Sequence, residues 1–109
     1  MKWIGVDLDG TLAYDTIEHM SSIEIGKPIP SIVKLVKDLS LEHEVRIFTA
    51  RVDGLALDYP VDKIVEAIED WCALHIGFIM EVTNIKDRNM LYLLDDRAVR
   101  VETNTGKLI

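Results

Sequence analysis

The sequence predicts an α/β fold, a Rossmann-like three-layer α/β/α domain with a central, mainly parallel sheet and no cap domain. Two observations support this prediction. Short apolar segments alternate with segments of helical periodicity. The polar residues that could bind a ligand or take part in catalysis follow apolar segments. Strands that are separated by helices pair in parallel. The 109 residues suffice for one domain, which we expect to span residues 1–109.

Four apolar segments are expected to be strands. They cover residues 2–8, 45–49, 78–82 and 90–94. The first segment leads into a turn that contains glycine, and the last ends at an acidic pair. Residues 99–109 are expected to add an edge strand or a tail, because two valines precede a Thr-Gly turn there.

Two segments have the spacing of amphipathic helices. Ser31 is expected to cap the first helix, whose apolar positions continue to Leu39. The second helix is expected from Val61 to about Ile76, and Gly77 would end it. Residues 12–30 lack periodicity and hold two prolines, so we expect a loop or a small flap.

Charge and cysteine content restrict the kind of protein. The formal net charge of −7 argues against broad electrostatic binding to nucleic acid or to an anionic membrane. Cys72 is the one cysteine and is expected to be a buried, inert thiol. The apolar run at the N-terminus is too short for a signal peptide, and no run has membrane-spanning length. We therefore expect a soluble, cytoplasmic protein.

Carboxylates are concentrated where two of the predicted strands end. Asp7 and Asp9 follow the first strand, and side chains two apart in an extended segment point the same way. Asp95 and Asp96 end the last strand, and the carboxyl ends of parallel strands meet at one edge of a sheet. Close carboxylates repel one another unless a cation or a proton lies between them. Because oxygen ligands suit a hard cation, the four residues predict a Mg²⁺ site.

A simple polar turn is one alternative for the segment from Asp7 to Gly10, because Asp and Gly are common in turns. It does not explain why an acidic pair recurs at the end of another strand. A calcium-binding EF-hand loop is a second alternative. That pattern requires Gly at its sixth position, where Leu12 stands, and a helix on each side, so it does not fit.

The segment Asp7-Leu8-Asp9-Gly10-Thr11 resembles the first motif of the haloacid dehalogenase superfamily of phosphohydrolases. Thr49, at the end of the next strand, is similar to the second motif. Lys86 is similar to the third motif, with Lys63 as its rival, and Asp95-Asp96 is similar to the fourth. The four motifs occur in the order of the family and span nearly the whole chain. The resemblance implies a capless member, because the two intervals where caps are inserted are short.

This resemblance also implies catalytic roles. Asp7 would attack phosphorus and form an aspartyl-phosphate, and Asp9 would act as general acid and then as general base. Magnesium would be held by the Asp7 side chain, by the backbone carbonyl of Asp9 and by a carboxylate of the acidic pair. Asp96 is expected to be the direct ligand of the pair, and Asp95 would support it or bind through water.

Other residues would bind the phosphoryl group. Thr49 would donate a hydrogen bond to it, and Lys86 would bring a positive charge. Gly10 would allow a tight turn whose backbone amides add donors. Arg51 and Arg97 each follow a motif directly, and each would either contact substrate or form a surface salt bridge.

The expected function is that of a magnesium-dependent phosphomonoesterase. An open, capless site suits a bulky phosphorylated substrate, such as a polymer end or a protein, unless a second copy of the chain covers it. The Asp-Asp-Arg ending resembles the phosphatase half of polynucleotide kinase-phosphatases. A polynucleotide or nucleotide phosphatase is therefore one alternative, in which nucleic acid binds only as a substrate end.

Two alternatives involve no turnover. One is a phosphoacceptor domain of the receiver type, in which the acidic pair and the phosphorylated aspartate occur in the opposite order. The other is a non-catalytic module that binds metal or phosphate and keeps the fold.

Overall fold

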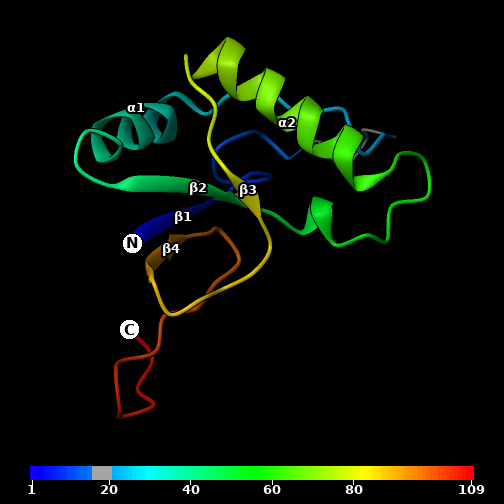
Figure 1. Cartoon of the computed structure of the whole chain (residues 1–109). Helices are drawn as coiled ribbons and strands as arrows, with labels where there is room; N and C mark the ends of the chain where they lie inside the picture. The colour runs from blue at the N-terminus through cyan, green and yellow to red at the C-terminus, as the bar shows by residue number, and fades with distance from the viewer. Residues whose placement is uncertain (16–20) are drawn as a thin grey trace.

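Four parallel strands form one sheet in the order β3-β2-β1-β4 in the computed structural model, which describes residues 1–15 and 21–109. The elements are β1 (Trp3–Asp7), α1 (Pro30–Leu39), β2 (Glu44–Phe48), the 3-10 turn η1 (Ala50–Val52), α2 (Val61–His75), β3 (Val82–Thr83) and β4 (Met90–Leu94) (Figure 1). The predicted α/β class with a parallel sheet is confirmed.

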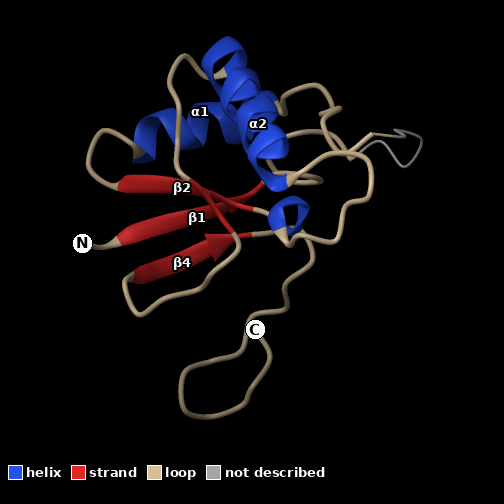
Figure 2. Cartoon of the chain, turned by 45° about the vertical axis from the view of Figure 1, so that its right-hand side comes forward, coloured by secondary structure: helices blue, strands red, loops and turns tan. Residues whose placement is uncertain are grey.

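Both helices cover the same face of the sheet (Figure 2). The steps from β1 to β2 through α1 and from β2 to β3 through α2 run in one direction across the sheet. Right-handed crossovers in one direction place their helices on one face. The step from β3 back to β4 runs in the opposite direction, and residues 84–89 make it without a helix. The connection crosses the second face, and no helix of the described residues lies on that face (Figure 2).

The main core lies between the helices and the sheet. Alternate residues of β1 and β2 face the helices, as the period of two requires. The buried cluster includes Val6, Leu8, Val36, Val45, Ile47, Ile64, Ile68, Trp71 and Cys72. Full burial of one such aliphatic side chain contributes about 1.5–3 kcal/mol. Cys72 is buried as predicted, and burial raises the pKa of its thiol to about 11.

Trp3 anchors the connection that crosses the second face. Its ring is fully buried, and its Nε1 donates a hydrogen bond of 2.8 Å to Asp87 in that connection. The guanidinium of Arg46 lies 4.6 Å from the ring centroid, and Phe48 stacks on the ring at 6.5 Å. Arg46 also pairs with Asp87 at 3.8 Å. These contacts hold the β3–β4 connection against the start of β1.

The first helix begins differently from the prediction. Its N-cap is Ile29, and no side chain caps it. Pro30 occupies the first turn, where its missing N–H would have had no partner in any case. Ser31 lies within the helix, so the prediction that it caps the helix was wrong. α2 ends at His75, and Gly77, with φ of +100°, donates to the Cys72 carbonyl, as expected of a terminating glycine.

The third strand is shorter and later than predicted. Only Val82 and Thr83 pair with β2, whereas residues 78–82 were expected to form the strand. Phe78 and Ile79 remain 37% and 59% exposed. Beyond β4 the chain leaves the sheet (Figure 1). The last residues form a tail that folds back on itself through a bridge between Val101 and Leu108 and a hydrogen bond of 2.7 Å from the Glu102 amide to the Lys107 carbonyl.

The predicted flap has a paired base. Tyr14 donates to the Lys27 carbonyl at 2.9 Å, and Ile29 donates to the Leu12 carbonyl at 2.8 Å. Trp71 on α2 donates to the carbonyl of Gly26 at 3.0 Å. The middle of the flap, residues 16–20, lies outside the described residues.

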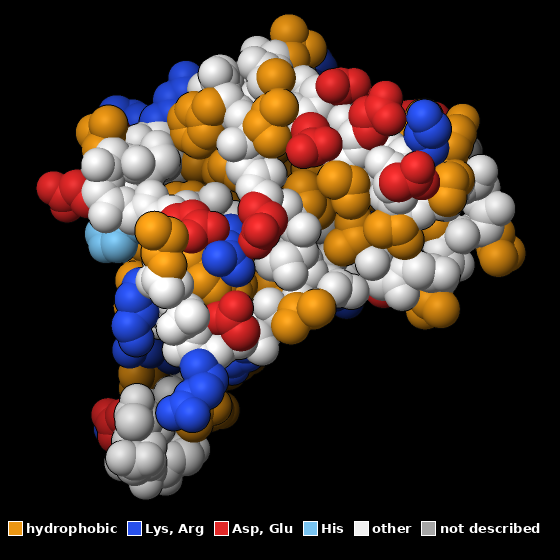
Figure 3. All heavy atoms as spheres, viewed as in Figure 1, with side chains coloured by type: hydrophobic (Ala, Val, Ile, Leu, Met, Phe, Trp, Pro, Cys, Tyr) orange, Lys and Arg blue, Asp and Glu red, His pale blue; other side chains and the backbone are white. Residues whose placement is uncertain are grey.

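The outer face of α2 is acidic. Asp62, Glu66 and Asp70 are spaced four apart and are exposed, so they form a stripe along one side of the helix. Figure 3 shows acidic side chains gathered over this helix. No helix in residues 1–15 and 21–109 is long and apolar enough to cross a membrane.

Candidate functional site

Three carboxylates meet at the carboxyl edge of the sheet. Asp7 ends β1, and Asp95 and Asp96 follow β4, which pairs directly with β1. Each residue contributes one oxygen to a group whose members all lie within 4.8 Å of one another. The parallel pairing of the two strands thus brings together three of the four carboxylates that the sequence predicts to converge.

In the described part of the chain, no ion pair joins a basic side chain to these three carboxylates. The pKa of Asp7 is raised from 3.8 to about 7, first by burial, then by a hydrogen bond with Asp96 and by repulsion from Asp95, Asp96 and Asp9. A cation between these oxygens would relieve the repulsion. A set of hard carboxylate oxygens matches the ligand preference of Mg²⁺. The residues present therefore fit the predicted metal.

The turn after β1 is built around Asp96. The Thr11 hydroxyl donates to Oδ1 of Asp96 at 3.1 Å and accepts from the Asp96 amide at 3.0 Å. Gly10 has φ of +91°, and a Cβ there would lie 2.5 Å from Oδ2 of Asp96. Gly10 thus serves two needs, a left-handed turn and a close approach to the cluster. The sequence suggested the turn but did not reveal the contact with Asp96.

We expect Gly10→Ala to weaken both the fold and the cluster. The positive φ should lower the free energy of unfolding by about 1–3 kcal/mol. The displaced carboxylate of Asp96 should also lower the affinity for Mg²⁺, which calorimetric titration would measure. Gly77→Ala is the matched control, because Gly77 also has a positive φ but nothing lies within 4 Å of its added Cβ. Equal Mg²⁺ affinity in the two variants would contradict the prediction.

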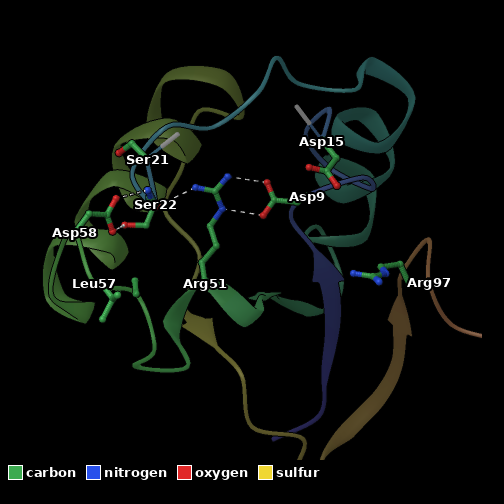
Figure 4. Close-up of a pocket in the computed structure, with 9 residues that line it drawn as sticks. Asp9, Asp15, Ser21, Ser22, Arg51, Leu57, Asp58 and Arg97 are labelled. Atoms are coloured by element: carbon green, nitrogen blue, oxygen red, sulfur yellow. Dashed lines mark hydrogen bonds and ion pairs between the residues drawn. The ribbon is translucent and has the colours of Figure 1, made fainter. Parts of the chain in front are cut away.

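Asp9 is held apart from the cluster by Arg51. Oδ2 of Asp9 accepts from Nε of Arg51, and Oδ1 accepts from Nη2, both at 2.8 Å (Figure 4). The side chains are 25% and 9% exposed, respectively. Nη1 of Arg51 donates to the Ser22 carbonyl at 2.8 Å. Arg51 thus forms a salt bridge, which was one of its two expected roles. The bridge is largely buried, however, and its acidic partner is the predicted catalytic residue Asp9. The Asp9 backbone carbonyl as a metal ligand stays a prediction.

Thr49 lies beside the motif of β1. It follows β2, is 2% exposed, and its amide donates to the Thr83 carbonyl at 3.0 Å. Its Oγ1 accepts from the amide of Arg51 at 3.2 Å and so caps η1. Among the described residues, no hydrogen bond uses its hydroxyl hydrogen, and its donation to a phosphoryl oxygen stays a prediction.

Neither candidate lysine contacts the carboxylates. Lys86 is exposed in the β3–β4 connection, between Thr83 and the Asp87 that binds Trp3. No ion pair of the described part of the chain involves it. Lys63 pairs with Glu66 at 3.5 Å on the surface of α2. The role of Lys86 at the phosphoryl group stays a prediction. Arg51 is a largely buried cation that lies in the site instead.

A cavity of about 640 Å³ opens beside Asp9 and Arg51. The flap and the loop before α2 supply most of its wall, and exposed Arg97 borders it from the β4 side (Figure 4). Asp58 closes one side by accepting from Oγ of Ser22 at 2.6 Å and from its amide at 2.8 Å. The sequence did not identify Asp15, Ser22 or Asp58 as residues of the site. Their only signal is that they lie in the two irregular segments beside the motifs.

The raised pKa of Asp7 predicts an unusual pH dependence of stability. Between about pH 4 and 7 the folded protein binds more protons at Asp7 than the unfolded chain does. The free energy of unfolding should therefore fall as pH rises through this range when magnesium is absent. Thermal denaturation of the wild type and of Asp7→Asn in chelator would show it as a difference in slope between about pH 4 and 7. Mg²⁺ competes with protons for Asp7 and should reduce that difference in the same range. A wild-type slope equal to that of the variant would contradict the prediction.

The chain was compared with protein-family models, with curated proteins and with solved structures, and none of them matches it.

Proposed function

We propose that the protein is a magnesium-dependent phosphomonoesterase of the haloacid dehalogenase type, with Asp7 as its nucleophile. One observation carries the proposal. Three carboxylates, those of Asp7, Asp95 and Asp96, share one cation-binding position, while a fourth, Asp9, is held separately beside a cavity. This division supplies one group of oxygens for a metal and a separate carboxyl for proton transfer, as a phosphoryl transfer to and from aspartate requires.

Magnesium held by Asp7, Asp95 and Asp96 would supply positive charge that offsets the negative charge of the phosphate ester. A carboxylate oxygen of Asp7 attacks phosphorus, the ester bond between phosphorus and the leaving oxygen breaks, and that oxygen takes a proton from Asp9. In the second step Asp9 removes a proton from water, whose oxygen attacks the phosphorus of the aspartyl-phosphate. Inorganic phosphate leaves, and Asp7 is restored as a carboxylate.

Arg51 has a place in this chemistry as well. A guanidinium has five N–H groups, and three of them bind Asp9 and Ser22. Two N–H groups remain for phosphoryl oxygens, which suits the planar fork of arginine. Asp9 must take up a proton from solvent before it can protonate the leaving oxygen, and one of its two bonds to Arg51 must open for this. We propose that Arg51 then turns toward the phosphoryl group, in the role first expected of Lys86.

Release of inorganic phosphate from p-nitrophenyl phosphate, with magnesium or with a chelator, tests the proposal. Turnover that requires magnesium is expected, and equal turnover in chelator would refute the mechanism. A phosphorylated protein that persists without turnover would favour the phosphoacceptor alternative. Magnesium binding without turnover of any ester would favour a non-catalytic module.

A further inference from the structure

The cavity beside the proposed reaction centre has two different sides (Figure 4). Arg97, which follows the acidic pair directly, borders the side nearest Asp9. On the other side of Arg51 lie Leu57 and Asp58, both from the loop that leads into α2. The phosphoryl group must lie near Asp7 and Asp9, so the remainder of the cavity is where a leaving group would fit.

The charges of the lining are unevenly distributed. Asp9 and Arg51 neutralise each other through their paired hydrogen bonds. Among the described lining residues, two carboxylates then remain against one cation, Arg97. Asp58 lies beyond Arg51, and Asp15 lies beside Asp9, on the same side as Arg97 (Figure 4). The pKa of Asp58 is lowered by the hydrogen bonds from Ser22, so this carboxylate is ionised at neutral pH. The acidic stripe of α2 follows the same loop and adds more negative charge beyond it.

Asp58 is also held in a defined position. Ser22 donates to both of its carboxylate oxygens and accepts from Arg51 through its own carbonyl. An unbroken series of hydrogen bonds thus runs from Asp9 through Arg51 and Ser22 to Asp58 (Figure 4). A carboxylate fixed in this way keeps lone pairs that can accept from ligand hydroxyls. Ala56 and Leu57 provide an apolar surface beside it.

We propose that the cavity accepts a small, uncharged leaving group rich in hydroxyls, so that the preferred substrates are monophosphates of sugars or polyols. This inference rests on the proposed phosphomonoesterase function. Hydroxyls would donate to Asp58 and Asp15, and the carbon face of the substrate would pack on Leu57. The volume of about 640 Å³ is in the range of small-molecule sites. A second phosphate, or the backbone of an oligonucleotide, would bring like charge to the two carboxylates.

A matched pair of substrates tests this inference. Fructose 6-phosphate and fructose 1,6-bisphosphate differ by one phosphate group, and a 5′-phosphorylated oligonucleotide adds a polymeric anion. We expect kcat/KM for phosphate release with magnesium to be at least about tenfold higher for the monophosphate than for either polyanion. Asp58→Asn and Asp15→Asn should each reduce that ratio by about threefold or more. Glu42→Gln, an equal charge change in the loop before β2, should leave the ratio unchanged.

The possible outcomes separate this inference from the proposed function. Turnover of p-nitrophenyl phosphate together with a polyanion preferred over the monophosphate would overturn the inference alone. So would a ratio that neither aspartate variant alters. Asp15 is exposed, so Asp15→Asn decides the matter if Asp58→Asn fails to fold. No magnesium-dependent turnover of any ester would overturn the proposed function itself, and the inference with it.

Discussion

Asp7→Asn should reduce magnesium-dependent phosphate release by roughly a thousandfold or more, for every substrate. The amide that replaces the carboxylate is a poor nucleophile toward phosphorus and removes one of the oxygens that share the cation position. Among the described residues, no other side chain is proposed as a nucleophile that could replace Asp7 beside the metal-binding carboxylates. Steady-state kinetics with p-nitrophenyl phosphate would measure the loss.

The same substitution should stabilise the fold when magnesium is absent. Asp7 is partly buried next to two carboxylates, and this burial and repulsion raise its pKa to about 7 and make its negative charge unfavourable. Asp7→Asn removes that charge and should raise Tm at pH 8. Asp70→Asn, on the exposed face of α2, is the matched control and should alter neither activity nor Tm appreciably. A lower Tm in Asp7→Asn, or activity near that of the wild type, would show that Asp7 is a structural residue instead.

Sequence reasoning succeeded where topology alone decides the outcome. The apolar run 90–94 is bounded by polar residues on both sides, and the observed β4 has the same limits. Because β4 and β1 are parallel neighbours, the residues that follow them must meet at one edge. That rule suffices to bring Asp7, Asp95 and Asp96 together without any knowledge of side-chain positions.

Prediction from the sequence failed where hydrogen bonds between residues distant in the chain set the positions of side chains. Asp9 was expected to point the same way as Asp7, but the alternation of a strand ends at Asp7, and the turn at Gly10 follows. The direction of Asp9 is then set by Arg51, 42 residues away. The path of the connection that carries Lys86 depends on the bond between Asp87 and Trp3. Local sequence patterns do not indicate hydrogen bonds between side chains that are so far apart in the sequence.

Asp9→Asn should have an effect that depends on the leaving group. An alkyl phosphate needs a proton on its departing oxygen, so kcat should fall by about 10²–10⁴-fold. The p-nitrophenolate ion leaves without a proton, so the first step with that ester should be affected far less. Hydrolysis of the aspartyl-phosphate would still lack its base. Acid-quenched Asp9→Asn should therefore carry one added phosphoryl group after exposure to p-nitrophenyl phosphate, detectable by mass spectrometry.

This variant should also lose stability, in contrast to Asp7→Asn. Arg51 is 9% exposed, and an amide at position 9 can accept only one of its two charged hydrogen bonds. We expect the free energy of unfolding to fall by about 1–3 kcal/mol. A double-mutant cycle with Arg51→Gln would measure the coupling between the two side chains. An equal loss of kcat for alkyl and p-nitrophenyl esters, without accumulation of phosphoprotein, would mean that Asp9 positions Arg51 and transfers no proton.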